Sequence, residues 1–246
     1  MIFENPFFDN ILVIPCYNEY KRISTTKFER ILKKHQNLLI FFADDGSNDD
    51  TVQKIKPLTE NNINCNSVRY ERNEGKASTI RKTIIKSYEI YRFNKIGFID
   101  ADLSVSVEEY LNISKSLRKD ILFCFGSRIS KIDNQIQRSI YRHIVGRFYS
   151  TLLDYFFQIG MYDSQCGCKV ISSSIGKQIF SDIFVSTWIF DIEIFLRLKK
   201  LNPKLGSFCR EIPLKSWKEI EGSKVPITYS LNIWLDIITI YRKYSG

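Results

Sequence analysis

Residues 95–104 read KIGFIDADLS, an apolar run that predicts a buried strand, followed directly by the carboxylates of Asp100 and Asp102. Because side chains at positions i and i+2 of an extended strand lie on the same side, both carboxylates would point the same way. Two carboxylates so close repel each other unless a cation lies between them, and oxygen ligands suit Mg²⁺ or Mn²⁺. A solvated turn with acidic helix caps is the alternative, but the position at a strand end favours a metal site.

Strand and helix patterns alternate on both sides of this stretch. The expected strands are residues 11–14, 38–43, 67–70, 95–99 and 121–125, and the helices between them start at Ser24, about Asp50, after Gly75 and at Glu108. This order predicts an α/β fold, a mainly parallel sheet flanked by helices. A helical stretch at 134–160, a strand at 168–171 and helices at 188–200 and 227–244 are expected to follow. We therefore expect one catalytic domain, residues 1–226, and a C-terminal amphipathic helix, residues 227–246.

Polar clusters follow each of the first five strands, where ligands bind in parallel sheets. They are PCYNE at 15–19, DDGS at 44–47, RNEGK at 72–76, DAD at 100–102 and GSR at 126–128. Asp44 and Asp45 alone could form a turn and a helix cap, but beside the first loop a carboxylate can also accept hydrogen bonds from a base or a sugar. Gly75-Lys76 before a helix could bind phosphate, although the sequence is not a P-loop.

The composition is that of an ordinary folded protein of 246 residues with a net charge of +9. This charge favours an anionic partner, such as a phosphorylated molecule or a membrane surface. The basic residues are spread along the chain without a nucleic-acid-binding motif, so we expect no nucleic acid. Six cysteines lack zinc-site spacing and are expected to be reduced, as in a cytosolic protein. We expect no secretory signal and no membrane span.

Two helical stretches admit two interpretations each. The one at 134–160 combines an apolar stripe and many aromatic residues with Arg138 and Arg142, expected one turn apart on one side, so it suits the core or a membrane interface. The one at 227–244 carries a stripe that includes Leu231, Trp234 and Ile238. It is either a docked terminal helix or a second interfacial helix.

Eight motifs, in order, carry a resemblance to a known family. They are IPCYNE at 14–19, DDGSNDDT at 44–51, NEGKA at 73–77, DADLS at 100–104, GSR at 126–128, DSQCGCKV at 163–170, WIFDIEI at 188–194 and WKEIEGSKV at 217–225. Together they resemble the catalytic domain of glycosyltransferase family 2, which has the GT-A (Rossmann-like) fold. Within that family the pattern is most similar to the dolichyl-phosphate β-glucosyltransferases and related polyprenyl-phosphate sugar synthases.

The resemblance implies an inverting, metal-dependent transfer of a hexose from a nucleotide sugar, of the UDP-glucose or GDP-mannose type, to a polyprenyl or dolichyl phosphate. The resemblance implies that the donor is bound by Pro15, Tyr17, Asn18, Glu19, Asp44, Asp45, Lys76 and Asp100, and that a metal ion, Mg²⁺ or Mn²⁺, is bound by Asp100, Asp102 and Ser104. It implies catalytic or phosphate contacts for Asp102, Arg128, Asp191 and Lys224. It also implies that Arg138 and Arg142 bind the acceptor phosphate. Such relatives commonly carry an N-terminal membrane anchor. This chain is instead expected to associate peripherally with the cytoplasmic face of a membrane.

The chemistry of the acceptor separates the alternatives. A phosphate monoester is already an anion at neutral pH and needs cations, whereas a sugar hydroxyl needs a general base. A family 2 enzyme that acts on a hydroxyl in polysaccharide or glycolipid synthesis would use Asp191 as that base. With a phosphate acceptor, Asp191 would be structural or would orient the donor sugar. A non-catalytic nucleotide-binding module is the third possibility.

Overall fold

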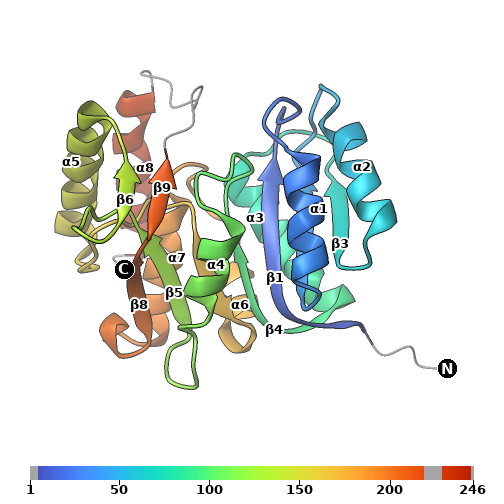
Figure 1. The fold of residues 1–246 in the computed structure, drawn as a ribbon. Helices are drawn as coiled ribbons and strands as arrows, with labels where there is room; N and C mark the ends of the chain where they lie inside the picture. Colours follow the sequence, from blue (N-terminus) through green and yellow to red (C-terminus); the bar gives the residue numbers. More distant parts are fainter. Residues whose placement is uncertain (1–4, 219–228, 245–246) are drawn as a thin grey trace.

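The computed structural model describes residues 5–218 and 229–244, which are built around a seven-stranded sheet (Figure 1). The sheet order is β3-β2-β1-β4-β7-β5-β8. The strands are β1 (Phe7–Cys16), β2 (Leu38–Asp44), β3 (Cys65–Arg69), β4 (Arg92–Phe98), β5 (Phe123–Ser127), β7 (Lys169–Ser172) and β8 (Cys209–Pro213). All neighbours pair in parallel except β7, which runs antiparallel to both β4 and β5. The prediction of a mainly parallel sheet is confirmed.

Helices cover both faces of this sheet. They are α1 (Thr25–Lys34), α2 (Thr51–Asn61), α3 (Lys76–Ile90), α4 (Val107–Ser114), α5 (Ile140–Phe157), α6 (Ser173–Phe180), α7 (Phe190–Leu201) and α8 (Tyr229–Tyr244), with a 3₁₀ turn at Leu205–Ser207. One core contains the buried faces of α1, α2 and α4, and the other contains those of α3, α5, α6, α7 and α8. Successive residues of β1 and β2 alternate between the two cores, which explains why both strands are almost wholly apolar.

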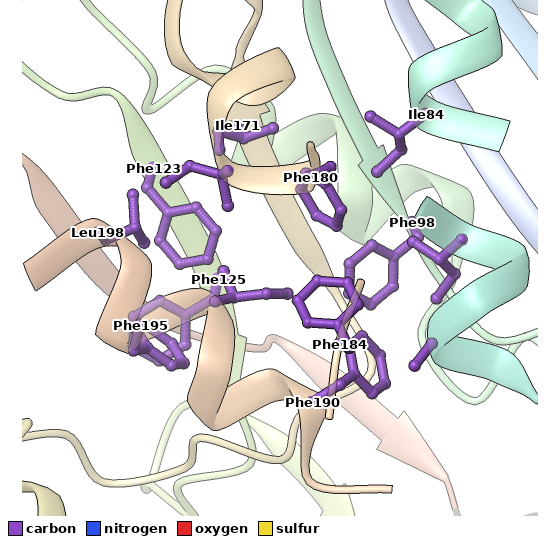
Figure 2. Close-up of a cluster of buried hydrophobic side chains, with 14 of the residues drawn as sticks. Ile84, Phe98, Phe123, Phe125, Ile171, Phe180, Phe184, Phe190, Phe195 and Leu198 are labelled. Carbon is purple, nitrogen blue, oxygen red and sulfur yellow. The ribbon is translucent and has the colours of Figure 1, made fainter. Parts of the chain in front are cut away.

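Phenylalanines dominate the second core (Figure 2). The ring of Phe195 on α7 packs edge-on against Phe123 and Phe125 of β5, with centroids 5.4 and 4.9 Å apart. Phe184 and Phe190 pack together beside them at 5.5 Å. These contacts fix the start of α7 against the centre of the sheet.

The prediction of one helix over 134–160 is wrong for its first part. Residues Gln135–Gln137 form β6, which pairs in parallel with β9 (Ser216–Lys218). The Asn134 side chain donates to the carbonyls of Ile129 and Leu214, which ties this segment to the end of β8. Arg138 therefore precedes α5 and is not part of the helix in which the sequence had placed it together with Arg142. The sequence patterns also missed α6 and β8.

The C-terminal helix α8 docks onto the molecule. Ile233, Ile237 and Ile240 are buried in the second core, and α8 lies beside α5 at the β8 end of the sheet (Figure 1). Across residues 5–218 and 229–244, none of the helices has the length and apolarity that crossing a bilayer requires.

Candidate functional site

The polar clusters predicted from the sequence come together at the carboxyl ends of β1, β2 and β4. The loop after β1 is tied to the loop after β2: the Asn18 amide donates to Ser47 Oγ (2.9 Å), and the Asn48 amide donates to Asn18 Oδ1 (2.9 Å). Asn18 adopts a positive φ of 54° to make both bonds. The Glu19 amide similarly donates to Thr51 Oγ1 at 2.8 Å. These bonds form one wall of a site at the sheet edge.

Three further residues of this wall were also predicted to contact the donor. Pro15 pairs with Ala43 in the β1–β2 register, and Tyr17 is partly buried just beyond the strand. The Glu19 side chain forms an ion pair with Arg22 at 3.2 Å, so it fixes its own loop.

Asp44 and Asp45, adjacent in sequence, have different partners. Asp45 accepts hydrogen bonds on both oxygens, from the amides of Glu74 (3.0 Å) and Gly75 (2.8 Å), and so holds the loop that precedes α3. Asp44 is only 2% exposed; its Oδ2 accepts from the Ser47 amide at 3.1 Å, but its buried Oδ1 accepts no hydrogen bond within the described residues. A buried carboxylate oxygen without a partner is costly, so Asp44 is suited to accept a hydrogen bond from a ligand.

Lys76, the first residue of α3, forms an ion pair with Asp100 beyond β4. Burial alone would lower the pKa of Lys76, but the carboxylates of Asp100 and Asp191 outweigh it and raise the pKa above its ordinary value. Lys76 is therefore the cation that compensates the acidic cluster.

Asp102 lies two residues further, in a tight turn in which Leu103 has a φ of 55°. Its Oδ1 accepts from the Ser104 amide at 2.9 Å, so Oδ2 is the candidate ligand atom of this carboxylate. In the part of the chain that the structure describes, no three His, Cys, Asp or Glu side chains form a metal cluster. Asp100 and Asp102 fit a hard cation chemically, but such an ion would need additional oxygen ligands, of the kind that a diphosphate supplies.

Arg128, at the end of β5, is locked by Asp163. Its backbone amide and Nε donate to Asp163 Oδ2 at 2.9 and 2.7 Å, and its Nη2 donates to Oδ1 at 2.8 Å. Burial alone would raise the pKa of Asp163, but the guanidinium outweighs it and lowers the pKa below its usual range. Glu211 of β8 in turn accepts from the amides of Tyr162 and Asp163. Arg128 thus presents a fixed positive charge on the side of the site opposite Asp44.

Asp191, in the first turn of α7, forms an ion pair of 2.6 Å with the buried ammonium of Lys169 on β7. Asp191 also raises the pKa of Lys76, so it belongs to the same cluster of charges. The sequence motifs indicated Asp191 but not its partner. A lysine inside the apolar strand at 168–171 was the signal that could have identified Lys169.

The remaining predicted residues differ in how far the structure describes them. Arg138 packs over α5, since a Cβ on Gly146 would come within 2.3 Å of its Nη2, and its charge contributes to lowering the pKa of Asp163. It therefore lies beside the Arg128 pair. The side chain of Arg142 and the whole of Lys224 lie outside the described part of the chain.

Apolar side chains are exposed along α5 and α8. On α5, Ile140, Tyr141, Ile144, Phe148 and Tyr155 are each more than 60% exposed, and on α8 so is Leu235, with Trp234, Ile238 and Tyr241 about half exposed. A groove of about 1090 Å³ separates the C-terminal half of α5 from α8; its lining includes Tyr155, Phe156, Trp234, Ile238 and Tyr241. These surfaces leave a broad apolar face beside the site.

Comparisons with known proteins agree with the resemblance that the motifs indicated. A family model described as Glycosyl transferase family 2 matches residues 11–180. The dolichyl-phosphate beta-glucosyltransferase of Dictyostelium discoideum is 27% identical over 98% of this chain and 77% of its own length; the human protein of that name is 28% identical over 99% and 78%. Glucosyl-3-phosphoglycerate synthase from Mycobacterium tuberculosis, solved with Mn²⁺, UDP-glucose and glycerol 3-phosphate, has a TM-score of 0.68 at 15% identity, covering 97% of this chain and 80% of that one. That likeness confirms the GT-A fold.

Proposed function

The chain belongs to glycosyl transferase family 2, and from this premise we propose that it transfers a hexose from a nucleotide sugar to a polyprenyl or dolichyl phosphate at a membrane surface. The observation that carries the proposal is the arrangement at the sheet edge. Carboxylates suited to a nucleotide and a metal lie beside Lys76, and a fixed arginine, Arg128, lies on the other side. The names of the relatives favour glucose as the sugar and a dolichyl phosphate as the acceptor.

On the donor side, Asp44 would accept a hydrogen bond from the base or ribose through its unpartnered Oδ1. The loop held by Asp45 would present the start of α3 and Lys76 to the diphosphate. Tyr17, Asn18 and the backbone around Glu19 would complete the nucleotide pocket. Asp45 thus uses both of its oxygens to hold a loop, whereas Asp44 uses only Oδ2 in this way and keeps Oδ1 for a ligand.

A divalent cation would be held by Asp102 and Asp100, with Ser104 as a further candidate ligand. When bound, such an ion neutralises the charge that develops on the diphosphate as it leaves. Lys76 compensates Asp100 in the absence of ligands, and as the first residue of α3 it would contact the diphosphate when the donor binds. Mn²⁺ accompanies UDP in the mycobacterial synthase, which favours Mn²⁺ or Mg²⁺ here.

On the acceptor side, a phosphate monoester needs cations to position it and no strong base. Arg128 is held there by Asp163, and Arg138, against Gly146 of α5, is the second cation proposed to contact this phosphate. The apolar face of α5 begins directly after Arg138, so a polyprenyl tail that leaves this phosphate would meet apolar side chains. The same face would rest on the membrane that holds the acceptor.

Product analysis tests the proposal. The protein is incubated with labelled UDP-glucose or GDP-mannose, Mn²⁺ and a short polyprenyl phosphate, and we expect label in the chloroform-soluble fraction. Asp102→Asn should lower this transfer by at least about 100-fold, because the metal contributes several kcal/mol to charge stabilisation. Asp120→Asn, at an exposed turn before β5, makes the same charge change and should be neutral. Label that appears only on saccharide acceptors would contradict the proposal.

Transfer to a sugar hydroxyl is the second candidate, because Asp191 reaches the charge cluster and would be available as a base. In that reaction Asp191→Asn should abolish transfer. With a phosphate acceptor the same variant should keep appreciable activity, since an acceptor that is already an anion needs no base.

A further inference from the structure

Lys169 lies at the centre of the sheet, between the strands that carry the two halves of the site. In the register of β7 it is paired with Phe98 of β4 on one side and with Phe125 of β5 on the other. Asp100 and Asp102 follow β4, and Arg128 follows β5. A displacement at this position would therefore reach both halves.

The environment of Lys169 is apolar except at its ammonium. The side chain is 1% exposed, and its Nζ lies 5.8 Å from the ring centroid of Phe98 and 5.9 Å from that of Phe195, both members of the phenylalanine core (Figure 2). Burying a charge in such surroundings is costly unless it is fully paired. A lysine here therefore needs a specific set of partners.

The ammonium has three such partners. It donates to the carbonyls of Ser164 (3.0 Å) and Cys166 (2.8 Å) and forms the ion pair with Asp191 (2.6 Å). The ammonium thus donates two hydrogen bonds and lies against one carboxylate oxygen, so three oxygen atoms surround it. Two of the partners belong to one turn, residues 164–166, and the third belongs to the first turn of α7.

The residues directly before and after the 164–166 turn contact the two halves of the site. Asp163, directly before it, holds Arg128. Gly167, directly after it, lies against the carboxylate of Asp100, because a Cβ at this glycine would come within 2.3 Å of Asp100 Oδ2. The position of this turn therefore sets where Arg128 and Asp100 lie relative to each other.

We propose that Lys169 is a positioning residue, which fixes the 164–166 turn and thereby the spacing between the donor-side carboxylate Asp100 and the acceptor-side Arg128. The proposal rests on the function proposed above. It leaves out the part of the pocket proposed for the base and the ribose, since Asp44 and Asp45 are held by the loops after β1, β2 and β3. Lys169 should thus affect the rate of transfer and not the affinity for a nucleoside monophosphate bound without a metal ion.

Lys169→Met keeps the shape of the side chain and removes the ammonium. We expect kcat to fall by about 100-fold, the effect that a displacement of about 1 Å has on reacting groups. The Kd for UMP or GMP without a divalent cation, a ligand that does not use the Asp100–Asp102 metal site, is measured by calorimetry and should stay within about threefold, a change below 0.7 kcal/mol. Wild-type kcat in the folded variant would overturn the proposal, and so would a large loss of nucleotide affinity.

A matched control separates positioning from stability. Arg197 on α7 is also a buried cation; it donates to the carbonyls of Ile179, Asp182 and Ile183, away from the charge cluster. Arg197→Met should destabilise the protein as well. Compared at a temperature at which circular dichroism gives the same folded fraction, Arg197→Met should keep kcat within about threefold. If kcat fell equally in Lys169→Met and Arg197→Met, in proportion to the unfolded fraction of each, the proposal would be overturned.

A second variant changes the spacing between the turn and Asp100 and leaves the ammonium in place. Gly167→Ala would displace the Asp100 carboxylate from the turn, and we expect kcat to fall at least about tenfold. Gly206→Ala, where a Cβ would meet nothing within 4 Å, should be neutral. Full activity of Gly167→Ala would overturn the proposal even if Lys169→Met failed to fold.

The activity of the wild-type protein distinguishes a failure of the proposed function from a failure of the positioning role of Lys169. If it makes no glycolipid, the proposed function fails, and the same variants are compared by hydrolysis of the nucleotide sugar with Mn²⁺, which uses the same donor groups. A loss of hydrolysis in Lys169→Met and Gly167→Ala, with nucleotide affinity kept, would still support the positioning role. Hydrolysis at the wild-type rate in both variants would overturn it.

Discussion

At the scale of single residues, each carboxylate of the site has its own partner and therefore its own task. Asp45 binds two backbone amides, Asp100 binds Lys76, Asp163 binds Arg128, and Asp191 binds Lys169. Asp44 differs because it is buried and one of its oxygens has no partner among the described residues. A hydrogen bond that a ligand makes to this oxygen would replace no existing interaction.

The first prediction concerns that oxygen. Asp44→Asn should weaken nucleotide binding by about 10- to 100-fold, because hydrogen bonds to charged groups contribute about 1.5–3 kcal/mol. Calorimetric titration with UDP and GDP in the presence of Mn²⁺ measures the change. Asp120→Asn is the control, and equal affinities of the two variants would contradict a role of Asp44 in binding.

The second prediction concerns the cysteines, which are all buried and unbridged, as the sequence had suggested. Burial raises the pKa of Cys65, Cys124, Cys166 and Cys209 to about 12. Because the thiolate is the reactive form, these thiols should react with iodoacetamide at pH 8 far more slowly in the native protein than after unfolding in urea. Rapid alkylation of Cys166 in the folded protein would contradict the structure at the 164–166 turn.

At the scale of elements, residues 186–189, directly before α7, connect the C-terminal helix α8 to the loop that precedes α3. Ser186 Oγ donates to Asp236 on α8 at 2.6 Å and accepts from the amides of Trp188 and Ile189, which precede α7. A Cβ at Gly75 would lie 3.5 Å from Thr187. α8 therefore helps to hold in place the segment that leads into α7 and Asp191.

The third prediction follows from this connection. Ser186→Ala removes the acceptor for two amides and leaves Asp236 without that hydrogen bond, so the free energy of unfolding should fall by about 1–3 kcal/mol. Urea unfolding followed by circular dichroism measures it. Ser181→Ala, an exposed serine at the end of α6, should change it by less than about 0.5 kcal/mol. If both variants had the same stability, α8 would not be anchored through Ser186.

The elements also explain how much the sequence could predict. Strands such as β1 and β2 are apolar on both faces, so they could be recognised in the sequence. Because the carboxyl ends of parallel strands meet at one edge of a sheet, Asp44, Asp100 and Asp102 could also be placed from the sequence. β6 could not, because three residues of alternating polarity form a strand only where β9 lies beside them. The roles of Asp163 and Lys169 depend on β7 running antiparallel between β4 and β5, and no local pattern specifies that order.

At the scale of the whole molecule, the apolar face of α5 and α8 lies at the β8 end of the sheet, far from α1 and α2 (Figure 1). Lys199 and Lys200 of α7 and Arg242 and Lys243 of α8 lie in the last turns of their helices beside this face. Lys199 donates to the carbonyls of Phe157 and Gln158 at the end of α5, so the basic cluster and the apolar face are contiguous. Apolar residues bordered by cations are the combination that binds an anionic membrane surface.

The last prediction is that this face binds membranes. Phe148→Ser combined with Trp234→Ser should weaken binding to vesicles that contain anionic lipids by at least about tenfold, because each side chain contributes about 1 kcal/mol or more when it leaves water. Vesicle co-sedimentation measures it. Ile63→Ser, on the α2 side, removes a side chain that is 91% exposed and should bind as the wild type does. If the double variant sediments with vesicles as well as Ile63→Ser does, the face of α5 and α8 is not a membrane-binding surface. If both lose binding equally, the apolar contribution is not specific to α5 and α8.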